Sequence, residues 1–381
     1  MSDSFPHVCI LAPYAFPLLA GDDAIQVIGG AELQMVIVAK LLAARGRRIS
    51  MVCLDFGQQD RLEIEGITVI RAYEPDEGVP VLRFVWPRLT SMWACMKRAD
   101  ADVYYQQTAG MLTGVMAEFC RRHRRKSVFA SASNPDLFPN TPRIQFARDR
   151  WIYAYGLRHV DRIFVQNDEQ ARLCRTNLGR EPILVPNCYE LPAGQTAEAK
   201  GNYILWVSTI RRLKRPEQFL DIARAFPNQQ FRMIGGPDNS ERDLYARIKE
   251  RADAMENVEF LGFVTFARIE EHFDEAKLFV NTSESEGVPN AFLQAWARGV
   301  PTVSFIDAGA KLGGVSIGFQ VNTLKEMIGV IADLESDPLK RGLEGRRCAE
   351  YVEKVHSSER VIPLYEQLFA ELAGSDGAPR R

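Results

Sequence analysis

Two kinds of apolar pattern alternate along most of the chain. Short runs rich in Val, Ile, Leu and Phe, such as VCIL beginning at Val8, alternate with longer segments in which apolar residues recur every three or four positions. The short runs predict strands that are buried on both faces, and the longer segments predict the helices that cover them. This alternation is typical of parallel sheets flanked by helices and therefore predicts an α/β fold.

The alternation stops once and then starts again, which divides the chain into two parts. Residues 191–201 (LPAGQTAEAKG) are small or polar, lack periodicity, and are predicted to be a linker. We predict two doubly wound domains, at 1–190 and 202–373, with the last helix able to pack back on the first domain, and an unstructured tail at 374–381. Strands are predicted at 8–12, 49–54, 67–72, 103–106, 127–131, 162–166, 183–186, 203–208, 230–234, 258–262, 278–281, 302–305 and 318–321, and helices include 31–45, 216–225, 241–254 and 291–298.

Composition agrees with this division and narrows the function classes. A chain of 381 residues with 46% hydrophobic and 25% charged residues fits two ordinary globular domains. The sequence shows neither an apolar run of about 18 residues nor a secretory signal. A net charge of −2 disfavours a general nucleic-acid binder.

Cysteine and histidine usage argues against a metal site. The seven cysteines are scattered without a CxxC pair, and the five histidines show no HExxH spacing. An odd number of dispersed cysteines indicates reduced thiols, and hence a cytoplasmic location.

The most informative loop follows the predicted strand that ends at Asn281, within NTSESEGVPNAFLQAWARGVP. A polar loop leads into a helix there, and a helix start offers free N–H groups and a dipole that favours an anion. The residues placed at this helix start are Gly287, Val288, Pro289 and Asn290.

Two side chains of this segment are candidates for binding hydroxyl groups. Glu286 lies in the loop and Gln294 lies one turn into the helix, and both can accept hydrogen bonds from a sugar or a ribose. The alternative is purely structural, with Asn290 capping the helix and Glu286 solvated in the loop.

A basic segment follows the strand that ends at Ser208. Cations just beyond the carboxyl end of a strand suit a diphosphate, whose negative charge grows as a sugar bond breaks. A solvated basic loop is the alternative. The cations of this segment are Arg211, Arg212, Lys214 and Arg215.

Two loops of the first domain are weaker candidates. Gly29 and Gly30 open a predicted helix after a long loop, and paired glycines allow close backbone approach. In SASNPD, the polar residues Ser133, Asn134 and Asp136 could contact a donor or an acceptor, but a structural turn built by Asn-Pro-Asp is the favoured interpretation.

The basic run Arg121-Arg122-His123-Arg124-Arg125-Lys126 ends a predicted helix. A solvated helix end is one interpretation. Contact with an anionic membrane surface or a lipid-diphosphate acceptor is the other.

The loop beginning EGVPN resembles the signature of glycosyltransferase family 4, a retaining family with the GT-B architecture. The family motif, EG-(F/V)-P-N-x-x-L-E-A-x-x-x-G-x-P, carries two glutamates, which fall here on Glu286 and Gln294. The resemblance implies that Glu286 lies beside the donor sugar hydroxyls. Gln294 departs from the motif at the position that binds the ribose hydroxyls.

The basic segment resembles the family element G-R-L-x-x-x-K-G, which binds the donor phosphates. Lys214 aligns with its lysine, whereas its arginine falls on Thr209, which leaves Arg211 and Arg212 as alternatives. Gly29 and Gly30 resemble the GGxE loop that faces the diphosphate. SASNPD lacks the histidine that many members place in that loop.

The resemblance implies two Rossmann-like domains that face a central cleft. It implies transfer of a hexose-type sugar from a nucleoside-diphosphate sugar to a glycan, lipid-linked or small-molecule acceptor, with retention of configuration and without a metal or other cofactor. Surface polysaccharide or glycoconjugate synthesis at the inner membrane face would be the setting. A non-catalytic nucleotide-sugar binder and a nucleotide-sugar epimerase are the alternatives.

Overall fold

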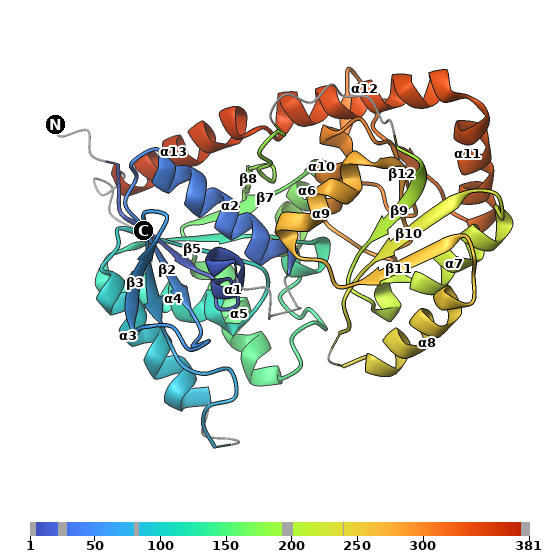
Figure 1. Cartoon of the computed structure of the whole chain (residues 1–381). Helices are drawn as coiled ribbons and strands as arrows, with labels where there is room; N and C mark the ends of the chain where they lie inside the picture. The colour runs from blue at the N-terminus through green and yellow to red at the C-terminus, as the bar shows by residue number, and fades with distance from the viewer. Residues whose placement is uncertain (1–4, 22–28, 80–83, 193–200, 239, 375–381) are drawn as a thin grey trace. The chain divides into compact units, whose positions relative to one another are not determined.

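The computed structural model describes residues 5–21, 29–79, 84–192, 201–238 and 240–374, which form two compact units (Figure 1). Unit 1 comprises the described residues up to Cys188 together with helix α13 (Ser358–Gly374), and unit 2 runs from Tyr189 to Ser357. The predicted second domain, 202–373, therefore ends earlier in the structure. Most of the predicted linker and of the predicted tail lie outside the described residues.

Unit 1 is built on an eight-stranded sheet with the order β3-β4-β2-β1-β5-β6-β7-β8. All neighbouring strands are parallel except β3 and β4. The strands are β1 (Val8–Leu11), β2 (Ile49–Cys53), β3 (Arg61–Ile64), β4 (Ile67–Arg71), β5 (Val103–Gln107), β6 (Lys126–Ala130), β7 (Arg162–Val165) and β8 (Ile183–Leu184). The helical segments are α1 (Phe16–Ala20), α2 (Gly30–Ala44), η2 (Val85–Leu89), α3 (Thr90–Ala99), α4 (Met111–His123), η3 (Asn134–Leu137), α5 (Ala147–His159), α6 (Asp168–Leu178) and α13.

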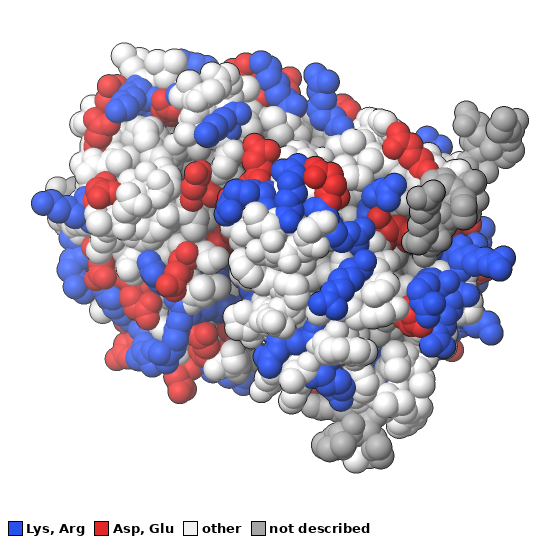
Figure 2. All heavy atoms as spheres, turned by 180° about the vertical axis from the view of Figure 1, so that it is seen from behind, with Lys and Arg blue, Asp and Glu red and all other residues white. Residues whose placement is uncertain are grey.

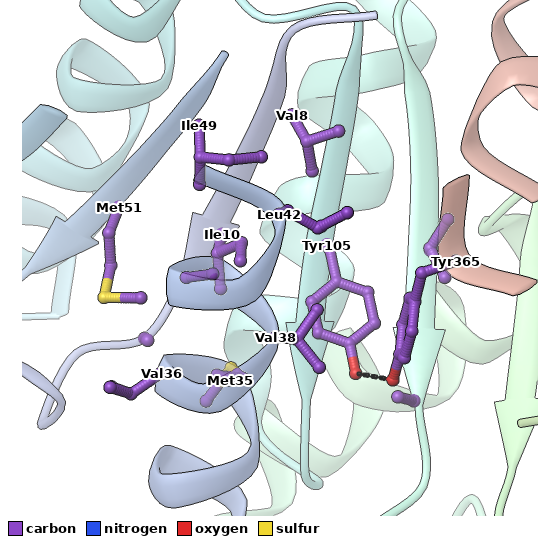
Figure 3. Close-up of a cluster of buried hydrophobic side chains, with 14 of the residues drawn as sticks. Val8, Ile10, Met35, Val36, Val38, Leu42, Ile49, Met51, Tyr105 and Tyr365 are labelled. Atoms are coloured by element: carbon purple, nitrogen blue, oxygen red, sulfur yellow. Dashed lines mark hydrogen bonds between the residues drawn. The ribbon is translucent and has the colours of Figure 1, made fainter. Parts of the chain in front are cut away.

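Side chains alternate between two cores on the faces of this sheet, as a strand covered on both sides requires. In β1, Val8 and Ile10 face α2, while the neighbouring Cys9 and Leu11 face α3 and α4. Figure 3 shows the α2 side of the sheet, where Tyr105 of β5 lies 3.4 Å, oxygen to oxygen, from Tyr365 of α13. The apolar face of α13 is thus part of the unit 1 core, which explains why this last helix belongs to unit 1.

The edge strand β3 is an element that the sequence interpretation missed. It pairs with β4 through a two-residue turn in which Glu65 has φ 49° and Gly66 has φ 77°. Two successive positive φ values are the geometry of a type I′ hairpin turn. The Glu-Gly pair between RLEI and ITVI was the available signal.

Helices α4 and α5 cross unusually closely. A Cβ atom added to Gly156 of α5 would lie 2.6 Å from the backbone N of Gly114 on α4. One added to Gly114 would lie 2.1 Å from the carbonyl oxygen of Ile152. The two glycines therefore allow backbone-to-backbone contact between the helices.

Unit 2 has a parallel six-stranded sheet with the order β11-β10-β9-β12-β13-β16 and a separate hairpin, β14-β15. Numbered from the start of the unit, the sheet has the order 3-2-1-4-5-6 of a doubly wound nucleotide-binding fold. The strands are β9 (Tyr203–Val207), β10 (Gln230–Ile234), β11 (Val258–Gly262), β12 (Ala276–Asn281), β13 (Thr302–Ser304), β14 (Lys311–Leu312), β15 (Val315–Ser316) and β16 (Phe319–Gln320). The helical segments are η4 (Arg212–Lys214), α7 (Pro216–Ala225), α8 (Arg242–Asp253), α9 (Phe266–Asp274), α10 (Asn290–Ala297), α11 (Leu324–Ser336) and α12 (Pro338–Val355).

The predicted α/β class, with two Rossmann-like units, is confirmed. In unit 1 the parallel strands from β4 to β7 have the same 3-2-1-4-5-6 order, followed by β8. The order reverses between β1 and β5 in unit 1 and between β9 and β12 in unit 2. Such a reversal opens a crevice at the carboxyl ends of the two strands, which is where ligands of this fold class bind.

A buried histidine in unit 1 makes stability depend on pH. The side chain of His7 is 6% exposed, and its Nε2 lies 2.8 Å from Ser50 Oγ. Burial, reinforced by Arg48 and opposed by Asp102 and Asp100, lowers the pKa of His7 to about 4. Between pH 6.5 and 4 the unfolded chain then binds a proton that the folded chain does not, so stability falls as the solution is acidified.

We expect His7 alone to lower the free energy of unfolding by about 3 kcal/mol between pH 6.5 and pH 4. Urea titrations of the protein and of His7→Gln across this range measure the effect. The variant should show a shallower pH dependence. Parallel pH profiles for the two proteins would contradict a neutral, buried His7.

Candidate functional site

The candidate site lies at the switch point of unit 2, where β9 and β12 are neighbours. Lys214 closes η4, which follows β9, and Glu286 lies in the loop between β12 and α10. Lys214 Nζ forms an ion pair with Glu286 Oε1, and the two side chains are only 16% and 17% exposed. The structure thus joins the two residues that the sequence placed first among the candidates.

The surrounding hydrogen bonds fix this pair in place. Ser283 Oγ donates to Glu286 Oε1 at 2.8 Å. Thr282 Oγ1 donates to the Lys214 carbonyl oxygen at 2.7 Å and lies 2.9 Å from Trp206 Nε1, which donates to it. The loop after β12 is therefore tied to the loop after β9, and the ion pair is preorganised.

Ser283, Thr282 and Trp206 were not recognised from the sequence as parts of the site. The first two stand in the NTSESEG segment next to Glu286, but no spacing rule assigns them a partner. Their function is visible only when β9 and β12 are side by side.

The arginines near Lys214 have carboxylate partners of their own. Arg211 Nε lies 2.6 Å from Asp238 Oδ2, and Arg215 Nη2 lies 3.0 Å from Glu284 Oε1. Arg212 is the most exposed of these cations, with 79% of its side chain accessible. Its backbone N–H donates to Glu241 Oε2, which also lies 3.8 Å from the Arg212 Nε. Lys214 is therefore the cation of this segment that pairs with Glu286.

The helix start after Glu286 has the predicted form. Helix α10 begins at Asn290, one residue before the predicted start, and its N-cap residue is Pro289, which has no side-chain hydrogen bond to offer. Val288 is 8% exposed and packs in the hydrophobic core on this face of the sheet. The segment that follows Gly287 and leads into α10 is therefore fixed by apolar packing.

Gln294 belongs to a second, buried polar network. Its side chain is 5% exposed, and its Nε2 donates to Glu270 Oε1 on α9 at 2.9 Å. Glu270 Oε2 also lies 2.9 Å from the Tyr189 hydroxyl and 2.5 Å from Arg298 Nη2. Burial and the nearby Glu270 raise the pKa of Tyr189, which keeps its hydroxyl a donor.

This network explains the glutamine at position 294. An ionised carboxylate only accepts hydrogen bonds, so the amide N of Gln294 faces Glu270 and its carbonyl oxygen faces away. A glutamate at this position would place a second carboxylate against Glu270. Sequence reasoning missed Glu270, because nothing near it in the sequence indicates Gln294 as a partner.

We expect Gln294→Glu, the substitution towards the family motif, to lower the free energy of unfolding by about 2 kcal/mol at pH 7, because a carboxylate at the buried position 294 would be repelled by the partly exposed Glu270 carboxylate. The double variant Gln294→Glu/Glu270→Gln exchanges the groups and should recover most of this loss. Urea denaturation of both variants and of Glu270→Gln measures the coupling. Additive effects would contradict a direct pair.

The glycines Gly29 and Gly30 lie at the start of α2 in unit 1. Gly29 is the N-cap residue, and a Cβ added there would lie 2.1 Å from Glu32 Oε2. The Glu32 side chain therefore folds back over Gly29, and burial raises the pKa of its carboxyl. The absence of a side chain at Gly29 makes room for this close approach of Glu32.

The SASNPD loop of unit 1 is braced by its own aspartate. The Asp136 carboxylate is fully buried and accepts hydrogen bonds from the backbone N of Ala132 and Ser133 and from Ser133 Oγ, a capping box at the start of η3. Burial raises the pKa of Asp136. Ser133 is also buried, whereas Asn134 is partly exposed. Asp136 therefore builds the turn, as the structural interpretation predicts. A substrate contact by Ser133, Asn134 or Asp136 stays a prediction.

Metal-ligand clusters and membrane spans are both lacking in the part of the chain that the structure describes. Among these residues, no group of three or more His, Cys, Asp or Glu side chains could hold a metal ion. Within the same residues, no helix is both long and apolar enough to cross a bilayer. All seven cysteines are buried as thiols.

Comparison with known protein families identifies the chain. A profile described as "Glycosyl transferases group 1" matches residues 201–334, and one described as "Glycosyl transferase 4-like domain" matches residues 29–188. The chain belongs to the family 4 glycosyltransferases. The two matches fall on unit 2 and unit 1, and the first contains both Lys214 and Glu286.

Two curated relatives of this glycosyltransferase match over short stretches. The α-monoglucosyldiacylglycerol synthase of Acholeplasma laidlawii is 26% identical over 161 residues, covering 41% of this chain and 39% of the relative. One subunit of the phosphatidylinositol N-acetylglucosaminyltransferase of Arabidopsis thaliana is 27% identical over 124 residues, covering 32% and 25%. The match thus spans about two fifths of the first relative and a quarter of the second.

Solved structures resemble the glycosyltransferase over almost its full length. The sucrose-phosphate synthase of Thermosynechococcus elongatus has a TM-score of 0.74 at 17% identity, over 97% of this chain and all of that chain. Anabaena HepE in complex with UDP and glucose has a TM-score of 0.72 at 17% identity, over 96% and 100%. The pneumococcal O-GlcNAc transferase GtfA in complex with UDP and GlcNAc has a TM-score of 0.69 at 10% identity, over 98% and 100%. At these identities the likeness shows the fold, which is GT-B as predicted.

Proposed function

We propose that this protein transfers a hexose-type sugar from a nucleoside-diphosphate sugar to a glycan, lipid-linked or small-molecule acceptor, with retention of configuration. The observation that carries the proposal is the Lys214–Glu286 pair, held by Ser283 and Thr282 at the switch point of unit 2. Two of the similar structures hold UDP and a sugar. That chemistry supports a nucleotide-sugar donor here.

In the proposed reaction Lys214 binds the donor diphosphate. Negative charge on the diphosphate grows as the bond to the sugar breaks, and a cation held in advance at that position stabilises the transition state more than the ground state. The N–H groups at the start of α10 and either Arg211 or Arg212 supplement this charge. We propose that these groups act without a metal ion.

Glu286 is proposed to bind the hydroxyls of the donor sugar. A donor phosphate that approaches Lys214 competes with the carboxylate for the ammonium group, and a sugar hydroxyl then replaces the lost hydrogen bond to Glu286. The carbonyl oxygen of Gln294, directed away from Glu270, accepts from the ribose.

Two rival functions share this site. A non-catalytic nucleotide-sugar binder would fit the departures at Thr209 and Gln294, but the preorganised Lys214–Glu286 pair favours the enzyme. A nucleotide-sugar epimerase would change its substrate without an acceptor, so product analysis in the absence of acceptor separates it from a transferase. We place the enzyme in surface polysaccharide or glycoconjugate synthesis, in the cytoplasm at the inner membrane face.

Thermal unfolding with a panel of nucleoside diphosphates and nucleotide sugars tests donor binding. A ligand at about 100 times its Kd should stabilise the folded protein by about 2.7 kcal/mol and raise the melting temperature measurably. The shift should be lost in Lys214→Ala and kept in Lys354→Ala, a change on the exposed side of α12. No shift with any nucleotide would refute the proposed donor site.

A further inference from the structure

One side of α5 in unit 1 presents aromatic and basic side chains to solvent. Arg148, Trp151, Tyr155 and Arg158 follow one another at intervals of three or four residues and so share a helix face. Trp151 is 72% exposed, and its ring stacks on that of Tyr155 with a centroid distance of 6.4 Å. Exposed apolar side chains indicate a contact surface where several of them form a contiguous patch.

Further apolar side chains lie next to this stripe. Phe146, just before α5, is 55% exposed. The Arg148 guanidinium lies 3.5 Å above the ring of Phe84, which brings the start of η2 alongside α5. There Val85 and Trp86 are 51% and 61% exposed. The exposed Trp151 and Phe146, on and just before α5, and the exposed Val85 and Trp86 of η2 thus belong to two segments that the Arg148–Phe84 contact joins.

The basic end of α4 extends the same surface. Tyr155 Oη donates to Glu118 of α4 at 2.5 Å, and Glu118 also pairs with Arg121 and Arg122. Counted from the sequence, α4 with its C-cap Arg124 and α5 carry six arginines against two carboxylates. Figure 2 shows one face of the molecule, on which Lys and Arg side chains and Asp and Glu side chains both stand among uncharged atoms. A chain with a net charge of −2 therefore concentrates positive charge on these two helices.

We propose that this α4–α5 surface docks on a bilayer that contains anionic lipids. Indole rings favour the interface between headgroups and acyl chains, and each arginine there is attracted by lipid phosphates. The combination of exposed Trp with an excess of Arg favours this occupant over a second copy of the chain, whose own surface would present the same positive charge. The basic run that ends α4 is one part of the surface, and Trp151 is its apolar anchor.

Helix α5 also contacts a candidate substrate loop of the same unit. On the opposite, buried side of α5, Tyr153 is bonded through its hydroxyl to the carbonyl oxygen of Asp136. The helix that meets the bilayer therefore also braces the Ser133–Asn134 loop.

Vesicle flotation of the full-length protein tests the surface. We expect binding to vesicles of phosphatidylcholine with phosphatidylglycerol, weak binding to phosphatidylcholine alone, and loss of binding as salt is raised. Trp151→Ala should reduce partitioning about tenfold, because a largely exposed indole would lose its membrane contact. Arg121→Ser/Arg122→Ser should weaken binding to the anionic vesicles.

The matched controls are Leu339→Ala and Lys354→Ser on α12 of unit 2, which remove an 83% exposed leucine and a 55% exposed lysine and should leave binding unchanged. Melting temperatures of all variants verify folding. Equal binding to neutral and anionic vesicles, or wild-type binding by Trp151→Ala, would overturn the proposal. A Trp151-dependent dimer in sedimentation would assign the surface to a second copy instead. Flotation needs no nucleotide, so its failure leaves the proposed donor site untouched.

Discussion

Replacing Lys214 with Ala is expected to reduce glycosyl transfer by at least about a hundredfold. The variant removes the cation that would stabilise the departing diphosphate, and losing one such preorganised group commonly costs two to three orders of magnitude in kcat. It also leaves the carboxylate of Glu286, only 17% exposed, without its ion-pair partner. Steady-state kinetics with the donor that the thermal panel selects measures kcat and KM separately.

Two further variants separate chemistry from folding. Lys214→Ala/Glu286→Gln removes the stranded charge, so its melting temperature should return towards that of the wild type while turnover stays low. Lys354→Ala, which changes an exposed lysine of the same unit, should keep full activity. A kcat for Lys214→Ala within twofold of the wild type would exclude Lys214 from the reaction.

Gly156→Ala should be among the most destabilising single-methyl additions in unit 1. The new Cβ would lie 2.6 Å from the Gly114 nitrogen and 2.7 Å from the Thr113 carbonyl carbon. Both neighbours are backbone atoms, so α4 and α5 must move apart. We expect a loss of about 3 kcal/mol and a fall in melting temperature of roughly 10 °C.

Gly329→Ala on α11 is the matched control. The added methyl meets nothing within 4 Å, and alanine is the better helix former. This variant should therefore be stabilised by about 0.5–1 kcal/mol. If the two substitutions changed the free energy of unfolding similarly, helix propensity and not the close crossing of α4 and α5 would explain the effect of Gly156→Ala. Because the α4–α5 surface depends on this crossing, Gly156→Ala should also weaken vesicle binding.

Most strands and helices of both units were predictable because their signals are local. A strand buried on both faces is a continuous apolar run, and VCIL at β1 and YILWV at β9 need no distant partner to be recognised. The missed β3 is an exposed edge strand in which Arg and Glu alternate with Leu and Ile. Its pattern is too short and too polar to stand out, and only pairing with β4 makes it a strand.

The sequence predicted the class of sheet but not the order of its strands in space. Alternating strands and helices indicate a doubly wound sheet, but which strands are neighbours follows from tertiary packing. The placement of β9 next to β12 brings together Lys214 and Glu286, which are 72 positions apart in the sequence. Similarly, α13 follows unit 2 in the sequence yet contributes Tyr365 and Phe369 to the core of unit 1.

The sequence by itself determined the α/β class, most element boundaries and the segments that hold the candidate site, because periodicity and the EGVPN loop are properties of neighbouring residues. Only the tertiary structure decided which side chains work together. It selected Lys214 over the arginines as the partner of Glu286, and it tied Gln294 to Glu270. The reason is physical. An ion pair or a buried hydrogen bond requires two groups within about 3 Å of each other, and residues far apart in the sequence come that near only when the chain folds.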